Sequence, residues 1–183
     1  MGNFYVNYTI RSSDVEAVTN ALAGRRAFVA SVIGKPIIAF DEESDSQNPN
    51  VVKELGCHIS QVTHSPVLAV MNHDDDILLC SLFEAGECID LYNSNPDYFE
   101  SEGEPRGPIG GNAAKLCQAF DSPNQEMVES ILRNNEYVFA VERHEALVKA
   151  LGLPSYGVAS GFSYISQGEL PAGLTLDNLV EVA

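Results

Sequence analysis

The order of secondary-structure elements in the first half of the chain constrains the fold more than any other feature. Residues 4–10 alternate in polarity and are rich in aromatic and β-branched side chains, which predicts a strand. Ser13 and Glu16 have the spacing of a capping box, and Gly24 is suited to end a helix at Ala23. A strand followed by a helix is therefore expected over residues 4–23.

Two strands and a second helix are predicted next. Residues 27–33 and 36–40 are mainly apolar, and we interpret Gly34-Lys35 between them as a two-residue hairpin turn. The acidic residues 41–48 predict a loop, and Asn48-Pro49 has the pattern of an N-cap followed by a proline at the first helical position. The helix that follows carries an apolar stripe of Val52, Leu55 and Ile59.

Residues 66–71, 77–83 and 88–92 predict three more strands, joined by a polar turn and by a tight turn at Ala85-Gly86. The first four strands and two helices then follow the order β-α-β-β-α-β, which is the ferredoxin-like unit. Hairpins would add the last two strands to its edge. With strands numbered along the chain, we expect an antiparallel sheet of order 6-5-4-1-3-2 with both helices on one face. The predicted class is α+β, with this unit in residues 1–92.

The second half of the chain predicts a mainly helical extension. Residues 93–111 are rich in Asn, Ser, Pro, Gly and acidic residues, and we expect a long loop pinned to the body by Tyr98 and Phe99. Residues 112–183 are too few to bury a core alone, so they should pack on the sheet or extend it within one compact domain. The pattern predicts helices at 113–120, at about 125–133 with Ser122 as N-cap, and at 142–151, and strands at 137–141 and 162–165, with 174–182 unassigned.

The net charge of −16, from 26 acidic and ten basic residues, limits the classes of partner. Nucleic-acid binding requires clustered Lys and Arg, and the only adjacent basic pair is Arg25-Arg26, so no nucleic-acid partner is expected. No apolar run approaches the ~18 residues that span a bilayer. Without a secretory segment or a CxxC pair, the chain is expected to be cytoplasmic with reduced thiols.

Cysteine and histidine spacing predicts no metal centre or catalytic pair. We expect Cys80 opposite Leu91 and Cys88 opposite Phe83 in a hairpin, so the two thiols point to opposite sides of the sheet. The neighbours Cys57-His58 diverge by about 100° on a helix, which disfavours an activated thiolate. The histidines match no zinc-ligand spacing, although the fold could still bring three of them around one ion: His58, His64 and His73.

Two acidic clusters, residues 41–45 and 74–76, carry enough carboxylates to hold Ca²⁺ weakly. The first lacks the spacing of a calcium loop, and the second lies in a hairpin turn, where Asp is favoured by local hydrogen bonds. We therefore interpret both as solvated turns, and we predict no metal or cofactor.

Arg143 and His144 are the most unusual candidates for a binding site. They occupy the predicted first turn of the helix at 142–151, and arginine is scarce in this chain. Together with Arg106 and Tyr98 of the long loop, they could receive an acidic group. The alternative interpretation is an exposed helix start, with Glu142 at the positive end of the helix dipole and Arg143 in local ion pairs.

Several segments of the chain resemble those of a known family: Tyr92…Pro96-Asp97-Tyr98-Phe99, Pro108…Gly110-Gly111, Val141-Glu142-Arg143-His144 and Leu151-Gly152-Leu153-Pro154. The chain is similar in these segments to a family of bacterial cytosolic proteins that has no assigned activity. The resemblance implies a bacterial cytosolic protein and implies no chemistry.

Two functions follow as hypotheses from the sequence. The first is a non-enzymatic domain that binds a small ligand or a basic protein, for example as an immunity-like protein, because the acidic charge favours a cationic partner. The alternative is a small-molecule enzyme with a site between the sheet and the C-terminal helices. It would use His144 as acid or base and Arg106 or Arg143 to hold an anion. An exposed sheet edge would instead favour self-association, and the sequence does not determine the oligomeric state.

Overall fold

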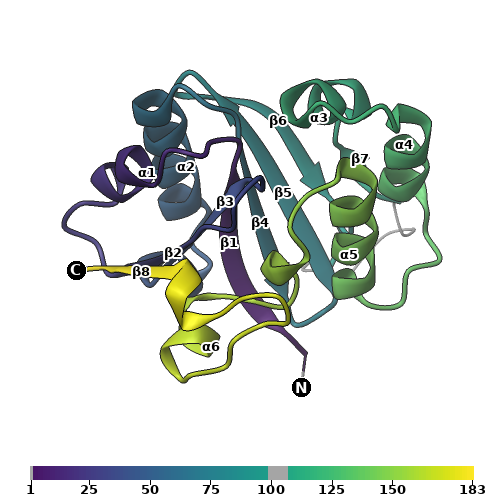
Figure 1. The fold of residues 1–183 in the computed structure, drawn as a ribbon. Helices are drawn as coiled ribbons and strands as arrows, with labels where there is room; N and C mark the ends of the chain where they lie inside the picture. Colours follow the sequence, from purple (N-terminus) through teal and green to yellow (C-terminus); the bar gives the residue numbers. More distant parts are fainter. Residues whose placement is uncertain (1, 99–106) are drawn as a thin grey trace.

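An open antiparallel sheet of eight strands runs through the computed structural model, which describes residues 2–98 and 107–183 (Figure 1). The order of its strands is β7-β6-β5-β4-β1-β3-β2-β8. The strands are β1 (Phe4–Ile10), β2 (Ala27–Ala30), β3 (Ile37–Asp41), β4 (Val67–His73), β5 (Ile77–Glu84), β6 (Glu87–Asn93), β7 (Ile109–Gly110) and β8 (Leu179–Val182). The expected order 6-5-4-1-3-2 is confirmed, and β7 and β8 extend it at the two edges.

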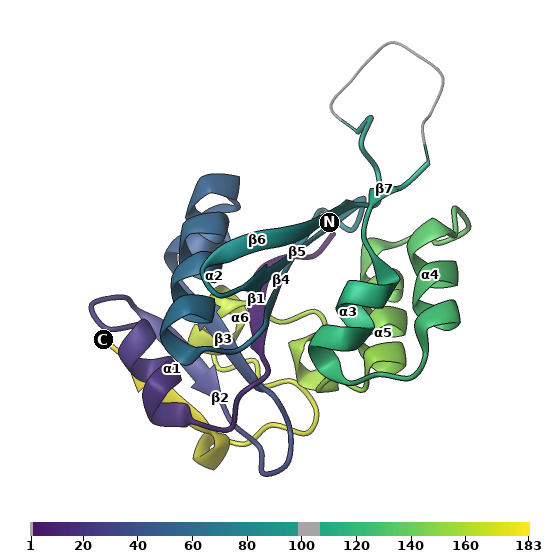
Figure 2. The ribbon, with the colours of Figure 1, turned by 90° about the horizontal axis from the view of Figure 1, so that it is seen from above.

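Six helices in the described residues cover both faces of this sheet (Figure 2). They are α1 (Val15–Ala21), α2 (Pro49–Thr63), α3 (Ala113–Phe120), α4 (Gln125–Arg133), α5 (Ala140–Leu151) and α6 (Phe162–Ser166). As expected, α1 and α2 lie together on one face, and α3 to α6 pack on the other. Residues 112–183 therefore both cover the sheet and, through β8, extend it.

Alternation along β1 explains how one strand serves two cores. Val6, Tyr8 and Ile10 face α1 and α2, while Tyr5 faces the helices of the other side. Asn7, also on the second face, is fully buried, and its amide donates to the carbonyl oxygens of Gly157 and Ser160 at 2.7 and 2.9 Å. These two hydrogen bonds attach the segment before α6 to the middle of the sheet.

The helix starts differ from the expected capping residues in two places. In α1 the side chain of Asp14, not Ser13, accepts a hydrogen bond from the Ala17 amide at 2.9 Å. In α4 the N-cap is Asn124, two residues after the expected Ser122. The cap of α2 at Asn48 and the cap of α3 at Asn112 are confirmed, since both side chains accept from amides of the first helical turn.

The hairpin between β2 and β3 is wider than expected. Ala30 pairs with Ile38, so the strands are joined by a longer loop that turns at residues 32–35, with Gly34 at a positive φ of 76°. Ser31 donates its amide to the Asn178 carbonyl, which directs this loop toward the C-terminal strand. A register shift in β6 likewise places Cys80 opposite Tyr92 rather than Leu91, while the pair Cys88 and Phe83 is confirmed.

Two predicted strands are helical or irregular in the structure. Residues 137–139 lead into α5, which begins at Ala140, because the Glu142 carboxylate accepts from the Phe139 amide and the edge of β6 is already paired with β7. Residues 162–166 form α6, whose first turn is capped by the distant Asp45. The unassigned tail forms β8, which pairs with β2.

The acidic residues 41–45 are not a solvated turn. Asp41 is fully buried and accepts two hydrogen bonds from Arg25, at 2.7 and 2.8 Å. Its Oδ2 also accepts from the amide and hydroxyl of Ser44. Burial raises the pKa of Asp45, whose carboxylate accepts from both the amide and the hydroxyl of Ser163. Both carboxylates therefore hold the fold together.

Candidate functional site

Arg143 lies in the first turn of α5 and is only 4% exposed. Its guanidinium donates to the carbonyl oxygens of Ile131 at 2.7 Å and Asn134 at 2.6 Å, at the C-terminal end of α4. The ring of Tyr137 lies against it, with 4.7 Å between the guanidinium carbon and the ring centre. Unpaired carbonyls and the negative end of the α4 dipole favour a cation here. The alternative interpretation of an exposed helix start with local ion pairs is therefore wrong for Arg143.

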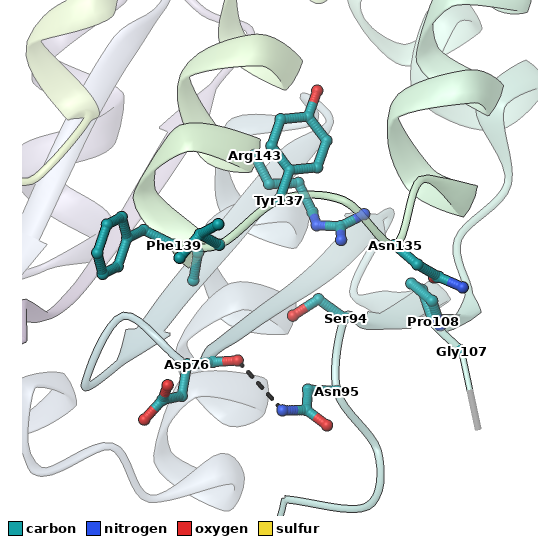
Figure 3. Close-up of a pocket in the computed structure, with 11 residues that line it drawn as sticks. Asp76, Ser94, Asn95, Gly107, Pro108, Asn135, Tyr137, Phe139 and Arg143 are labelled. Carbon is teal, nitrogen blue, oxygen red and sulfur yellow. Dashed lines mark hydrogen bonds between the residues drawn. The ribbon is translucent and has the colours of Figure 1, made fainter. Parts of the chain in front are cut away.

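A polar cleft of about 310 Å³ lies beside the Arg143 guanidinium (Figure 3). Three stretches of chain form it: the ends of the β5 and β6 strands, residues 107–108, and residues 135–140 before and at the start of α5. The lining residues are Asp76, Ser94, Asn95, Gly107, Pro108, Asn135, Tyr137, Val138, Phe139, Ala140 and Arg143.

Arg143 and Asp76 are the charged residues among those described as lining the cleft. The partners of Arg143 are backbone carbonyls and aromatic faces, all of them neutral, and within residues 2–98 and 107–183 no carboxylate forms an ion pair with it. Figure 3 shows the carboxylate of Asp76 pointing away from Arg143, while the Asp76 backbone carbonyl accepts from the Asn95 amide at 3.5 Å. A buried cation with no counter-ion among the described residues, beside hydroxyl and amide side chains, is suited to an anionic group.

His144 does not share this cleft. It is 3% exposed and faces β1, where its Nδ1 lies 2.7 Å from the hydroxyl oxygen of Tyr5. Asn72 donates to the same hydroxyl oxygen at 3.3 Å, and the tautomer of the imidazole sets which of Tyr5 and His144 is the donor in the bond between them. Burial lowers the pKa of His144 to about 3. Neighbouring helix positions point in different directions, which separates Arg143 from His144.

Two of the predicted binding residues, Tyr98 and Arg106, belong to the loop at 93–111. Tyr98 is about one-third exposed beside the cleft, its ring lies 6.0 Å from that of His73, and a hydrogen bond to the Asp76 carboxylate raises its pKa. Arg106 lies outside the described residues. Its place in the proposed anion site stays a prediction.

Three polar residues of the cleft were not anticipated: Ser94, Asn95 and Asn135. Each lies in an irregular segment with no motif spacing, and they meet only because β6 ends beside the segment that follows α4. Residue composition predicted a long loop at 93–111, and that is the single signal that covered Ser94 and Asn95.

Comparisons with family models, with curated proteins and with solved structures found no match. Function is therefore inferred from the residues and their geometry. In the described part of the chain, no group of three or more His, Cys, Asp or Glu side chains is arranged to hold a metal ion. None of the helices described here has the length and apolar character needed to cross a membrane.

Proposed function

We propose that this chain is a non-enzymatic binding domain whose Arg143 cleft holds a small ligand carrying a carboxylate. The observation that carries the proposal is the buried guanidinium that lines an open cleft and whose partners in residues 2–98 and 107–183 are all neutral. A planar guanidinium can donate two parallel hydrogen bonds to one carboxylate, and each charge-assisted bond contributes about 1.5–3 kcal/mol. The volume is at the lower end of the range of ligand pockets, roughly 300–1,000 Å³, which favours a small molecule.

The enzyme alternative has less support. His144 would have to exchange protons with a substrate, yet its pKa of about 3 keeps it neutral near pH 7 and its Nδ1 is engaged by Tyr5. It also does not line the cleft that contains Arg143. A general base needs both access to the substrate and a pKa near the working pH.

The test compares small carboxylates with their uncharged amides. Acetate, succinate and phenylacetate would each be titrated against the protein by calorimetry and by ¹⁵N NMR, alongside the matching amides. At least one carboxylate should bind with a Kd below about 1 mM, tenfold or more tighter than its amide, with shifts at Ser94, Asn95 and Asn135. Equal affinities within every pair, or shifts confined to other surfaces, would contradict the proposal.

Variants separate the cleft from the general charge of the protein. Asn95→Trp fills the cleft from its surface and should abolish binding without a change in melting temperature, since Asn95 makes only a long 3.5 Å side-chain bond. Arg143→Lys keeps the charge but loses the planar donor pair, so affinity should fall about tenfold. Arg133→Met is the matched control, because Arg133 also donates to backbone carbonyls beside α4 yet does not line the cleft.

We also propose the ferredoxin-like description for residues 4–73. The element order β1-α1-β2-β3-α2-β4, the strand order β4-β1-β3-β2 and the position of both helices on one face support it. This is a statement about topology, and it assigns no function.

A basic protein partner is a second candidate, favoured by the surface at the β4–β5 turn. Asp74, Asp75 and Asp76 have no cationic partner among the described residues, and the exposed rings of Phe4 and Phe139 flank them. Carboxylates beside aromatic faces attract Arg and Lys. A labelled Arg-rich peptide should associate with the protein more slowly as the salt concentration rises. Asp76→Asn should weaken binding of the peptide, whereas Glu126→Gln should leave it unchanged. Salt-independent association would exclude this candidate.

A further inference from the structure

The opposite face of the sheet contains a second concavity, an apolar groove of about 510 Å³. Its side wall is the first two turns of α2, its floor is formed by β4, β5 and β6, and β7 closes the far side. The lining residues are Pro49, Asn50, Val52, Lys53, Ala69, Met71, Leu79, Ser81, Leu91, Tyr92, Asn93, Ile109 and Gly110.

The strand register explains why this part of the sheet is hollow. One row across the floor is Ala69, Ser81 and Leu91, in which the first two side chains are small. The adjacent row across the floor begins with Met71 and Leu79 and continues through Asn93 to Ile109. Helix α2 packs across β4, β5 and β6, and its later turns lie against the β5–β6 hairpin, where the Gly86 amide donates to the Ser60 hydroxyl (Figure 2). The groove lies along its first two turns.

Apolar side chains of the groove are left in contact with solvent. Leu91 is 63% exposed and Ile109 is 49% exposed, whereas Ala69 and Met71 on the same floor are buried. An apolar concavity of this size with few polar groups is the usual form of a small-molecule site. Tyr92, the remaining large residue, points its ring mainly to the other face, where it packs near Arg143.

One cation defines the polarity of the groove. Lys53 lines it and, among the described residues, forms no ion pair, although the chain has 26 acidic residues. The positive end of the 15-residue helix α2 lies at the same wall, at Pro49 and Asn50. The groove thus has an apolar floor and a positively charged margin.

We propose that this groove binds an amphiphilic carboxylate, a linear alkyl chain that ends in a carboxylate group. The alkyl chain of the ligand lies over the two rows of floor residues that contain Ser81 and Leu79, and its carboxylate pairs with Lys53. A hydrocarbon chain matches the apolar floor, and an anionic end group provides the partner that Lys53 lacks. This site is separate from the Arg143 cleft, which lies on the other side of strands β6 and β7.

The experiment uses decanoate below its micelle concentration, measured by calorimetry and by methyl NMR of Leu91 and Ile109. Because decanoate is itself a carboxylate, the titration is carried out in the Asn95→Trp protein, in which the Arg143 cleft is filled. Decanoate should bind in a saturable manner with shifts at both methyl groups. Decanol should bind about tenfold more weakly, and decyltrimethylammonium should not bind.

Three variants assign the contacts. Ser81→Phe fills the floor and should abolish binding of decanoate and decanol, and an unchanged melting temperature confirms that it folds. Lys53→Met should weaken decanoate about tenfold and leave decanol unchanged, which brings the two ligands to similar affinity. Lys149→Met is the matched control, since Lys149 is an exposed helical lysine that does not line the groove.

Several outcomes would overturn the proposal. Absence of saturable decanoate binding would do so, as would binding that survives Ser81→Phe. Equal affinity for decanoate and decanol in the Asn95→Trp protein with Lys53 intact would remove the role of Lys53. A dimer in sedimentation that Leu91→Ser converts to a monomer would show that a second copy occupies the groove instead. Each of these results leaves the carboxylate test of the Arg143 cleft unaffected.

Discussion

The buried pair of His144 and Tyr5 makes the stability of this protein dependent on pH in a defined direction. In the folded chain, burial lowers the pKa of His144 to about 3, while an unfolded histidine has a pKa of about 6.5. Between these values the unfolded chain binds a proton at this position and the folded chain does not. The free energy of unfolding therefore decreases as the pH falls from 6.5 toward 3, and the contribution is complete above pH 6.5.

The magnitude follows from the width of this window. Each pH unit below 6.5 costs about 1.4 kcal/mol, so lowering the pH from 7 to 5 should remove about 2 kcal/mol through His144 alone. For a chain of 183 residues, this corresponds to a decrease of roughly 4–8 °C in melting temperature. The imidazole is buried, so solvent does not screen this contribution.

The assay is urea unfolding at pH 7, 6 and 5, with the double variant Tyr5→Phe/His144→Leu as reference. This variant removes the hydrogen-bonded pair together, and Asn72 keeps a partner because it also donates to Asp75 at 2.9 Å. The raised pKa of Asp45 acts with the opposite sign, since the folded state binds that proton more readily, but it is common to both proteins and cancels in the difference. Parallel stability curves for parent and variant between pH 7 and 5 would refute the assignment of a neutral, buried His144.

Two further predictions concern packing and ion pairing. Gly56→Ala in α2 should destabilise the protein by about 1–2 kcal/mol instead of favouring the helix, because a Cβ there would lie 2.4 Å from the Phe83 ring; denaturant unfolding with Phe83→Leu in the same background should show less than additive losses. Asp41→Asn should cost about 3 kcal/mol by leaving Arg25 without its buried partner, whereas Glu43→Gln, at an exposed ion pair of the same arginine, should change the free energy of unfolding by less than about 0.5 kcal/mol in the same assay.

The elements that the sequence predicted well are those with a clear hydrophobic periodicity or with turn or capping residues in their own segment. Strand β1, the proline-started helix α2 and the hairpin at Ala85-Gly86 all match the expected positions, and their hydrophobic stripes are buried as expected. The segments whose type was predicted wrongly, at 137–141 and 162–165, are those where a distant residue helps to decide the local conformation. Asp45 caps α6 from 118 positions away, and the Asp75 carbonyl accepts from the Ala140 amide at the start of α5.

The candidate site shows the same division. Scarcity of arginine selected Arg143, and the structure places it on a cleft beside the segment in which composition had predicted a long loop. His144 was selected with it because the two are adjacent in sequence, but adjacent helix positions lie about 100° apart, and tertiary packing directs the imidazole to β1. Tyr98 lies beside the cleft through its bond to Asp76, and Arg106 stays a prediction.

By itself, the sequence determined the α+β class, the order of the six inner strands, the single face shared by α1 and α2, and the acidic charge, because these follow from composition, from short-range periodicity and from the order in which strands and helices connect. Only the tertiary structure decided that β7 and β8 complete the sheet, that Arg143 is buried against the end of α4, and that an apolar groove remains between α2 and the outer strands. These features depend on which side chains meet across long separations, and no local pattern in one chain encodes that information.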